Sequence, residues 1–445
     1  MNNRSTSLSR RKFIGNASLL SIVGAFKAGG LFTSCDSRKR YLMPDIPVTA
    51  PDGPPLKAGL IGCGDRGTGA ALNFVDAGPN LQITALADVL PDRIANCRKH
   101  LKEHRGIDIP DENCHLGFDA YKRVIDSDVD VILETSLAYC RPAHFEAAIQ
   151  ARKHVFLEKP AGVDAVGIRR VMAAGKMADA AGLTVIAGTQ RRHGVDYNQT
   201  FAMVKNGAIG ELISGTTYRL GMGPGIYPRQ EGWCDMEFMI RSKRWIWITG
   251  DIFLNFNVHV IDILNWFFEK HPVKAIGLGG KLRRPQGNNY DIGSVEYIFD
   301  NGKNYHCLAR YIDGCDLERG VKLLGTKGYT NCENKIWDYD GNLIWEYDYP
   351  LDERGRPRLA VPQFNQSHIN LVTAIRTNKP VNETHNLATS SMTGLLGREA
   401  AYTGKNLEWD NIMNSNLSLV PEKLQMGNVT RMPETPVPGT APVSG

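Results

Sequence analysis

The stretch from Gly62 to Gly67 constrains this chain most strongly, because it has the pattern G-x-G-x-x-G between an apolar run and a helix-like segment. The run Leu56–Ile61 predicts a buried strand, and Thr68–Ala77 has a helical composition. A second apolar run ends in Asp88, about twenty residues beyond the last glycine, as the acidic residue of a dinucleotide-binding turn does. The alternative interpretation is a plain glycine turn between a strand and a helix.

Each glycine of this pattern has a physical reason to be there. Gly62 allows a tight turn, Gly64 lets a pyrophosphate approach the backbone, and Gly67 lets the helix pack closely on the strand. The helix N-terminus offers unpaired N–H groups and a positive dipole end to the phosphates. Asp88 favours NAD over NADP, because its carboxylate accepts from the ribose 2′-hydroxyl and repels a 2′-phosphate, although Arg93 weakens this preference. The predicted cofactor-binding residues are Gly62, Gly64, Asp65, Arg66, Gly67, Asp88, Arg93, Ser136, Glu158 and Lys159.

Strand-like and helix-like segments alternate from residue 56 to residue 187, which predicts βαβ units and a parallel sheet. Beyond this point the expected strands are rich in β-branched and aromatic residues, and Asp300–Gly302 predicts a hairpin. We therefore expect an α/β Rossmann domain over 56–187, followed by an α+β domain over 188–410 with a large, mostly antiparallel sheet. Residues 411–445 are expected to form a C-terminal tail.

The N-terminus resembles a twin-arginine export signal. Arg10 and Arg11 precede a moderately apolar stretch that is too short and too polar for a membrane span. Cys35 ends a segment that resembles a bacterial lipobox, so a lipid anchor there is the expected membrane contact. We expect residues 1–35 to be the signal and lipobox, residues 36–55 to be a tether, and the protein to be exported to the periplasm. A basic, disordered N-terminal arm is the alternative.

The positive charge of the chain belongs to this N-terminal segment. Residues 1–34 carry five basic and no acidic side chains, and the formal net charge of the whole chain is +5, so the remainder is close to neutral. This balance gives no indication of nucleic-acid binding. None of the nine cysteines has the spacing of a zinc site, so no metal is expected. Because a twin-arginine substrate folds in the reducing cytoplasm before export, the thiols are predicted to be mostly buried and free.

A third feature, Glu158-Lys159-Pro160 at the end of a later strand, makes the chain resemble the Gfo/Idh/MocA oxidoreductases, which include glucose–fructose oxidoreductase and inositol dehydrogenase. The resemblance runs from about residue 56 to residue 409 and rests on the glycine-rich turn, Asp88 and the E-K-P sequence in this order. It implies a Rossmann domain joined to an open-faced sheet that mediates dimerisation or tetramerisation, and hence a homo-oligomer.

The resemblance also implies a catalytic lysine and a D-x-x-x-H pair on a helix that faces the nicotinamide. Lys159 matches the lysine and His259 the histidine, but Asn255 stands where the family commonly has Asp. An amide cannot take up a proton as a carboxylate does, so acid–base chemistry would rest on His259 with Lys159. The alternatives are a surface lysine before a proline and a core histidine. Asp262 is either a structural carboxylate or a residue that orients His259 or binds substrate; in a continuous α-helix it would share one face with Asn255 and His259.

Candidate substrate residues follow the last strand of the expected Rossmann domain. The segment that begins at Thr189 is basic and polar where a sugar would lie, and a solvated charged turn is its alternative. Aromatic rings suit the C–H faces of pyranoses, so Trp233, Trp245 and Trp247 are a candidate stacking platform, against the alternative of tryptophans in the core. The predicted substrate residues are Arg191, Arg192, His193 and Trp247.

These features predict an exported, NAD-dependent oxidoreductase that acts on a secondary hydroxyl of a sugar, glycoside or polyol. The periplasm supplies little free NAD, so the cofactor is expected to be held tightly and recycled in place. Two alternatives are an NAD-dependent glycoside hydrolase, which oxidises C3 transiently and eliminates the aglycone, and a sugar-binding lipoprotein without catalysis, which the amide at Asn255 favours.

Overall fold

A computed structural model describes residues 40–223 and 225–440, and the described residues from 41 onward form one compact unit. The predicted export signal and the candidate lipidation site, Cys35, lie outside the described residues. No helix within the described part of the chain is long and apolar enough to cross a membrane.

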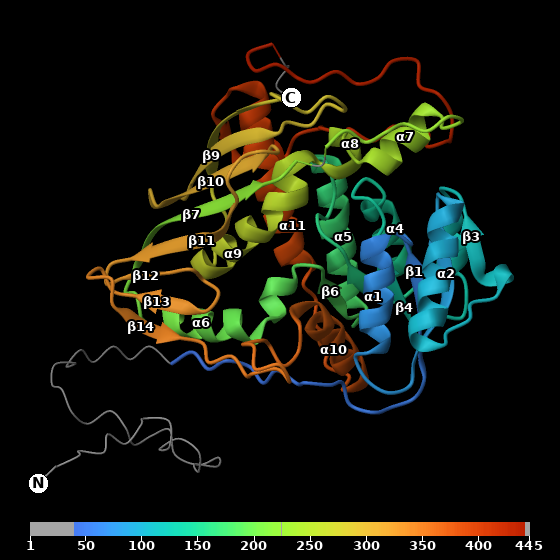
Figure 1. The fold of residues 1–445 in the computed structure, drawn as a ribbon, viewed down its shortest axis with the longest axis horizontal. Coiled ribbons are helices and arrows are strands. Elements are labelled where there is room, and N and C mark those ends of the chain that lie inside the picture. Colours follow the sequence, from blue (N-terminus) through green and yellow to red (C-terminus); the bar gives the residue numbers. More distant parts are fainter. Residues whose placement is uncertain (1–39, 224, 441–445) are drawn as a thin grey trace, which may run out of the picture. The chain divides into compact units, whose positions relative to one another are not determined.

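The first half of the unit is built on a six-stranded parallel sheet (Figure 1). Its strand order is β3-β2-β1-β4-β5-β6, so the chain starts in the middle of the sheet and reverses direction between β3 and β4. Strands β1, β4, β5 and β6 are apolar runs with almost every residue buried, as expected for strands covered on both faces. The strands are β1 (Leu56–Ile61), β2 (Leu81–Asp88), β3 (Cys114–Leu116), β4 (Val131–Glu134), β5 (His154–Leu157) and β6 (Val185–Ala187).

Helices cover both faces of this sheet. Helices α1, α2 and α10 pack in one hydrophobic cluster, and α3, α4 and α5 pack in another. Asp164 starts α5 by accepting a hydrogen bond from the Gly167 N–H (2.8 Å), and Gly106 ends α2 in the left-handed conformation. The helices are α1 (Asp65–Val75), α2 (Pro91–Arg105), α3 (Ala120–Ile125), α4 (Arg141–Gln150), α5 (Ala165–Ala180) and α10 (Gln363–Arg376).

The second sheet has nine strands in the order β14-β13-β12-β11-β7-β10-β9-β8-β15, and all its pairs are antiparallel except β7 with β10. Buried residues alternate with partly exposed ones along β9 and β10, so one face is covered and the other is open. The strands are β7 (Leu212–Gly221), β8 (Lys274–Gly280), β9 (Ile292–Ile298), β10 (Asn304–Tyr311), β11 (Glu318–Gly325), β12 (Tyr329–Thr330), β13 (Lys335–Trp337), β14 (Leu343–Glu346) and β15 (Leu407–Glu408). The predicted Rossmann domain and mostly antiparallel second sheet are confirmed.

Two helices lie between the sheets, α9 (Val258–Phe268) and α11 (Thr384–Thr403) (Figure 1). Helix α11 contacts α5 of the first layer as well as α9 and β8 of the second, so one apolar cluster runs through both halves. The remaining elements are η2 (Asp111–Asn113), η3 (Gln190–His193), α6 (Val195–Lys205), α7 (Asp235–Ser242), α8 (Ile246–Thr249), η4 (Phe253–Asn257) and α12 (Trp409–Met413).

Three predictions about segment boundaries need correction. Helix α10 lies in the predicted second domain by sequence, but it packs on α1 of the Rossmann layer. The described part of the predicted tether is held against the unit, since the Arg376 guanidinium donates to the Pro51 carbonyl (2.6 Å) and Ala50 is buried. The C-terminal tail also packs: Leu419, Leu424 and neighbouring apolar residues contact a hydrophobic cluster around α7 and α8.

Candidate active site

The glycine-rich turn connects β1 to α1 with the geometry that its residue types require. Gly62 has φ +95°, a conformation that residues with a Cβ rarely adopt. A Cβ on Gly67 would lie 1.8 Å from the Gly62 carbonyl oxygen, so the helix packs against the turn at a distance that only glycine allows. A Cβ on Gly64, in contrast, would have only Arg93 Nη1 near it, at 3.9 Å. The turn therefore leaves open space over Gly64 at the N-terminus of α1, where a phosphate binds.

Two polar side chains hold this turn from neighbouring strands. The Asp88 carboxylate at the end of β2 accepts from the Cys63 N–H (2.7 Å) and from the Leu90 N–H (2.9 Å). Thr135, just after β4, donates its hydroxyl to the Gly62 carbonyl (2.7 Å). Burial raises the pKa of Asp88, and the charge of Arg93 with the backbone donors opposes that rise. Asp88 thus shapes the turn and also lines the pocket beside it.

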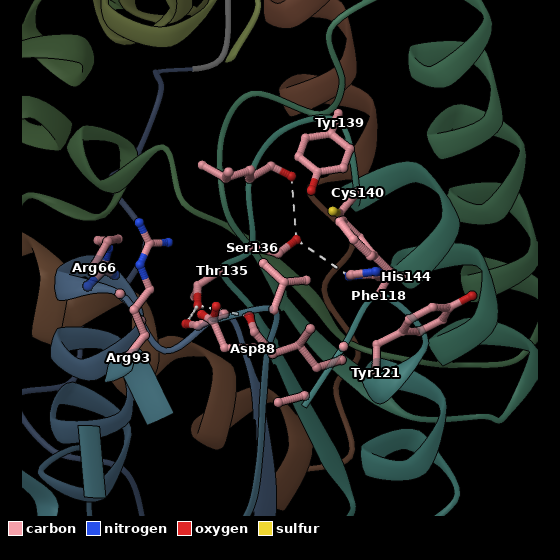
Figure 2. A pocket seen from close by; sticks show the side chains of 18 of the residues that line it. Arg66, Asp88, Arg93, Phe118, Tyr121, Thr135, Ser136, Tyr139, Cys140 and His144 are labelled. Carbon is pink, nitrogen blue, oxygen red and sulfur yellow. Dashed lines mark hydrogen bonds between the residues drawn. The ribbon is translucent and has the colours of Figure 1, made fainter. Parts of the chain in front are cut away.

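A pocket lies along this edge of the parallel sheet (Figure 2). Arg66 and Arg93 enter it from α1 and α2, and Phe118 and Tyr121 from the β3–α3 region, as the sticks in Figure 2 show. Open space over Gly64, two arginines and an acidic residue at the end of β2 fit a dinucleotide, with its pyrophosphate at the helix N-terminus. Of the predicted cofactor residues, those that line the pocket are Gly62, Gly64, Asp65, Arg66, Gly67, Asp88, Arg93 and Ser136.

Glu158 has a different role from the predicted cofactor contact. Its side chain is buried, and its two oxygens accept from Arg66 Nε (2.6 Å) and from the Lys159 N–H (2.9 Å). The Arg66 guanidinium also lies over the Phe364 ring of α10, 4.7 Å from its centroid. Glu158 therefore ties the N-terminus of α1 to the chain that carries Lys159, and it positions both residues.

Lys159 follows the carboxyl end of β5 and points to the second half of the unit. Its Nζ donates to the backbone carbonyl of Asn255 (2.7 Å). The buried Arg141 fixes the adjoining segment by donating to the Pro160 carbonyl (2.8 Å) and to the Ser136 carbonyl (2.6 Å). Burial lowers the pKa of Lys159 to about 8, against the opposing charge of Glu158. A lysine with this pKa exchanges its proton readily near neutral pH.

His259 lies in the first turn of α9. Burial lowers its pKa well below the usual value for histidine, and the positive charge of Lys159 adds to this effect. The ring is therefore neutral at physiological pH. Its Nδ1 is buried and has no hydrogen-bond partner among the described residues. A neutral imidazole with an unused ring nitrogen is able to accept a hydroxyl proton or a hydrogen bond.

The predicted continuous α-helix from Asn255 to Asp262 is wrong, because η4 is a π-helical turn that ends at Asn257. The wider turn changes the register, and the Asn255 carbonyl is the acceptor for Lys159. Asp262 is buried and its carboxylate accepts from Arg192 Nε (2.8 Å) and Nη2 (3.0 Å). It accepts also from the Ser390 hydroxyl (2.7 Å). Asp262 and Arg192 thus form a buried structural pair instead of the predicted catalytic and substrate contacts.

Two further substrate predictions are contradicted by burial. His193 is enclosed, with Nδ1 3.0 Å from Asn370 Nδ2 and Nε2 3.4 Å from a Glu383 carboxylate oxygen. Trp247 packs edge-on against Tyr139 at 5.0 Å in the cluster around α7, and Trp245 is buried in the same cluster, so neither offers a free ring face to a sugar. Trp233 is partly exposed, but its ring lies under the Arg241 guanidinium. Arg191 is the member of the predicted set that stays available.

Sequence reasoning missed a buried polar group at the end of β4. Glu134 is fully buried and accepts from the Ser136 N–H (3.1 Å), while His144 Nδ1 lies 3.0 Å from its second oxygen. The Tyr121 ring stacks on His144 at 4.0 Å. The signal in the sequence was a carboxylate at the end of an apolar strand. His144 comes from α4 and Tyr121 from α3, so spacing could not show that they gather at this carboxylate.

Arg219 on β7 was also missed, because an arginine in a strand usually faces solvent. Its charge, like that of Arg191, contributes to the lowered pKa of His259, so both arginines lie near that ring. Among the described residues, no group of three or more His, Cys, Asp or Glu side chains is placed to hold a metal ion. The eight described cysteines are free, and five of them are buried, as predicted.

Residues 56–189 match the family GFO_IDH_MocA, described as an oxidoreductase family with an NAD-binding Rossmann fold. An inositol 2-dehydrogenase from Acidothermus cellulolyticus is 27% identical over 271 residues, which are 58% of this chain and 70% of that protein. A glycosyl hydrolase family 109 protein from Bacteroides fragilis is 32% identical over 123 residues, 26% of this chain and 25% of the relative. The structure of scyllo-inositol dehydrogenase from Lactobacillus casei with NAD(H) and scyllo-inositol superposes with a TM-score of 0.59 at 20% identity, covering 80% of this chain and 99% of that one.

The fold, the glycine turn and the pocket beside it define an NAD-binding oxidoreductase of the Rossmann class. Residues 56–189 thus match the NAD-binding Rossmann domain of the Gfo/Idh/MocA oxidoreductases, and the chain is similar to inositol dehydrogenases over a longer stretch. The predicted family resemblance and the predicted cofactor, NAD, are confirmed.

Proposed function

We propose that this protein oxidises or reduces a secondary hydroxyl of a sugar, glycoside or polyol, with Lys159 and His259 managing the hydroxyl proton. The observation that carries the proposal is that Lys159, on the Rossmann side, reaches the Asn255 carbonyl beside the helix that presents His259. NAD, when bound, takes up or returns the hydride. The likeness to inositol dehydrogenases supports a polyhydroxylated substrate.

The proton chemistry follows from the two side chains. Lys159, whose pKa is about 8, is partly unprotonated at neutral pH and acts as the base for the hydroxyl proton. In the reverse direction its ammonium form returns the proton and stabilises negative charge on the oxygen. The neutral His259 ring accepts a hydrogen bond from the same or a neighbouring hydroxyl, and so orients it. Asn255 contributes its backbone carbonyl, which holds Lys159 in place without any need for a carboxylate.

The test is a panel of polyols and sugars added to the full chain loaded with NAD, with absorbance of the reduced nicotinamide as the readout. We expect at least one compound of the panel to reduce bound NAD. The ketone formed from that compound should in turn oxidise bound NADH. If the protein binds NAD but no hydroxylated compound reduces it, the result would favour the alternative of a sugar-binding protein without catalytic activity.

We further propose that the protein is exported by the twin-arginine route, is anchored through Cys35, retains NAD tightly, and assembles as a dimer or tetramer. The paired arginines and the lipobox-like sequence support export. Fractionation of cells that express the full chain tests it, with Arg10→Lys/Arg11→Lys as the comparison. We expect the wild-type chain in the periplasmic or membrane fraction and the variant in the cytoplasm. Equal distribution of both would reject export, and native mass spectrometry reports bound NAD and oligomeric state.

A second candidate is the NAD-dependent glycoside hydrolase, which the similarity to the family 109 protein supports. Such an enzyme releases an aglycone with no net change of NAD. A chromogenic glycoside separates the two reactions: aglycone release at catalytic NAD supports the hydrolase, and accumulation of reduced nicotinamide with intact glycoside supports the oxidoreductase.

A further inference from the structure

Several arginines lie on the proposed substrate side of the site. Arg219 on β7 and Arg319 on β11 are direct partners across the antiparallel pair. Like charges in this position repel each other and destabilise a sheet. Among the described residues, Arg219 has no hydrogen-bonding or ion-pair partner that would offset this repulsion. A bound anion near these two arginines would offset their repulsion.

Arg219 is placed on the covered face of the sheet, toward His259. Alternate residues of β7 share this face: a Cβ on Gly215 would lie 3.0 Å from Leu264 of α9, and Thr217 is fully buried. The partner of Thr217 on β10 is Cys307, whose Sγ lies 3.0 Å from Asn257 Nδ2 at the end of η4. Arg219, two residues beyond Thr217, therefore lies toward the η4 end of the helices, where Lys159 donates to the Asn255 carbonyl.

Arg191 adds a second guanidinium to this region from η3. It lies over the Tyr197 ring at 5.8 Å and has no ion pair with a described residue. Glu333 is the nearby acid, and burial raises its pKa although Arg191 opposes that rise. The charges of Lys159, Arg191 and Arg219 all act on His259 and lower its pKa, and a neutral sugar would add no negative charge to balance them.

The positive surface continues beyond Tyr311. The Tyr311 ring stacks on Phe256 of η4 at 4.5 Å and also lines a cavity of about 300 Å³. Arg284 lines the same cavity; it is 9% exposed, and its Nε and Nη2 have no partner among the described residues. The Asp291 carboxylate in this cavity is already engaged by the N–H groups of residues 282, 283 and 284, at 2.7–2.8 Å. The Nε and Nη2 groups of Arg284 therefore have no acceptor among the described residues, while the charge of Asp291 balances part of the charge of Arg284.

We propose that the substrate is an acidic sugar or polyol, whose carboxylate, sulfate or phosphate binds to Arg219 and Arg191 beside the hydroxyl that reacts at Lys159 and His259. This inference rests on the proposed function. Guanidinium groups bind these oxyanions through paired, charge-assisted hydrogen bonds, and they do so best where water is partly excluded. The acidic group both orients the ring and relieves the repulsion between Arg219 and Arg319.

The experiment compares matched ligands on the full chain loaded with NADH. Glucose is paired with glucuronate, glucose 6-sulfate and glucose 6-phosphate, and calorimetry measures binding while NAD-loaded protein reports turnover. We expect one acidic member to bind about tenfold or more tightly than its neutral partner, with an advantage that shrinks as salt rises. The identity of that member distinguishes carboxylate from sulfate and phosphate. Equal affinities for neutral and acidic members would overturn the proposal.

Variants locate the effect. Arg219→Gln should remove most of the acidic preference, so that the acidic and the neutral member of a pair bind with similar affinity. Arg310→Gln is the matched control, because Arg310 is opposite Leu220 and so projects from the other face of the same sheet. If Arg219→Gln and Arg310→Gln changed the preference for the acidic ligand equally, the proposal would also be overturned. Binding of the acid without any NADH formation would count against the proposed reaction and not against the acid site.

Discussion

The two ends of the active site are built by different means. At the cofactor end, the backbone makes the site: Gly62 is in a left-handed conformation, Gly67 packs against the turn, and Asp88 and Thr135 are bonded to its N–H and carbonyl groups. At the proposed substrate end, side chains make the site, and they come from the segment after β5 and from η3, β7 and α9. Asp88 and Thr135 are thus paired at the first end, whereas His259 Nδ1 at the second end has no hydrogen-bond partner among the described residues.

This difference has a physical consequence. A dinucleotide presents the same pyrophosphate to every enzyme of this kind, so a fixed backbone cradle serves it. A substrate has its own arrangement of hydroxyls and charges, and selecting it requires side chains that stay free until it binds. If Arg191 and Arg219 bind the substrate as proposed, they are the part of the site that is specific to this protein, and the glycine turn is the general part.

The largest effect should come from Lys159→Met, which removes the amine and keeps the length of the side chain. We expect turnover to fall about 10²–10⁴-fold, the range for loss of an acid–base group. NADH affinity should not change, because the cofactor turn is intact. Lys153→Met is the control: its Nζ also donates to a carbonyl (Val129, 2.7 Å), but at the other end of β5. Stopped-flow turnover with fluorescence titration of NADH makes both measurements, and an equal loss in both variants would contradict the role.

Asp262→Asn should damage stability and leave catalysis intact. Removing the charge from a buried ion pair strands the Arg192 guanidinium, which typically costs about 3–5 kcal/mol. Urea unfolding measures the loss, and a double-mutant cycle with Arg192→Met isolates the interaction between the pair. If Asp262→Asn had normal stability and impaired turnover, Asp262 would have a catalytic role instead of a structural one.

A pair of glycine substitutions sharpens the description of the cofactor end. Gly67→Ala places a methyl group 1.8 Å from the Gly62 carbonyl oxygen, so we expect a loss of about 1–3 kcal/mol of stability together with loss of NADH binding. Gly64→Ala meets open space, so stability should stay within about 0.5 kcal/mol. NADH binding by Gly64→Ala should nevertheless weaken about tenfold or more, because the methyl group occupies the pyrophosphate position. Unchanged NADH affinity in Gly64→Ala would place the pyrophosphate elsewhere.

The pH profile tests which group at the substrate end takes the proton. The unprotonated Lys159 amine is the active form for oxidation, so kcat/KM should rise by up to about tenfold per pH unit and level off above pH about 8. Reduction requires the ammonium form, so its profile should fall above the same value. The rise of kcat/KM with pH should remain in the His259→Asn variant. A profile that stays flat from pH 6.5 to 9 would assign the base role to His259, whose pKa is well below 6.5.

The sequence predicted the cofactor end well for a physical reason. Strand β1, the glycines and Asp88 are close in sequence, and each residue type follows from a local requirement of the turn. The same logic failed from Asn255 to Asp262, where a regular α-helix was assumed and a π-helical turn occurs. Burial of Trp247 was equally invisible, because an aromatic residue suits a core as well as a sugar platform.

By itself, then, the sequence determined the Rossmann fold and the preference for NAD, because these depend on local patterns. A family resemblance was enough to select Lys159 and His259 as the candidate catalytic residues. Only the tertiary structure decided that Arg192 and Asp262 neutralise each other while Arg191 and Arg219 remain open toward His259. Charge pairing between distant segments depends on which side chains the fold brings within a few ångströms. That information resides in the packing of β7, η3 and α9, and in no single stretch of the chain.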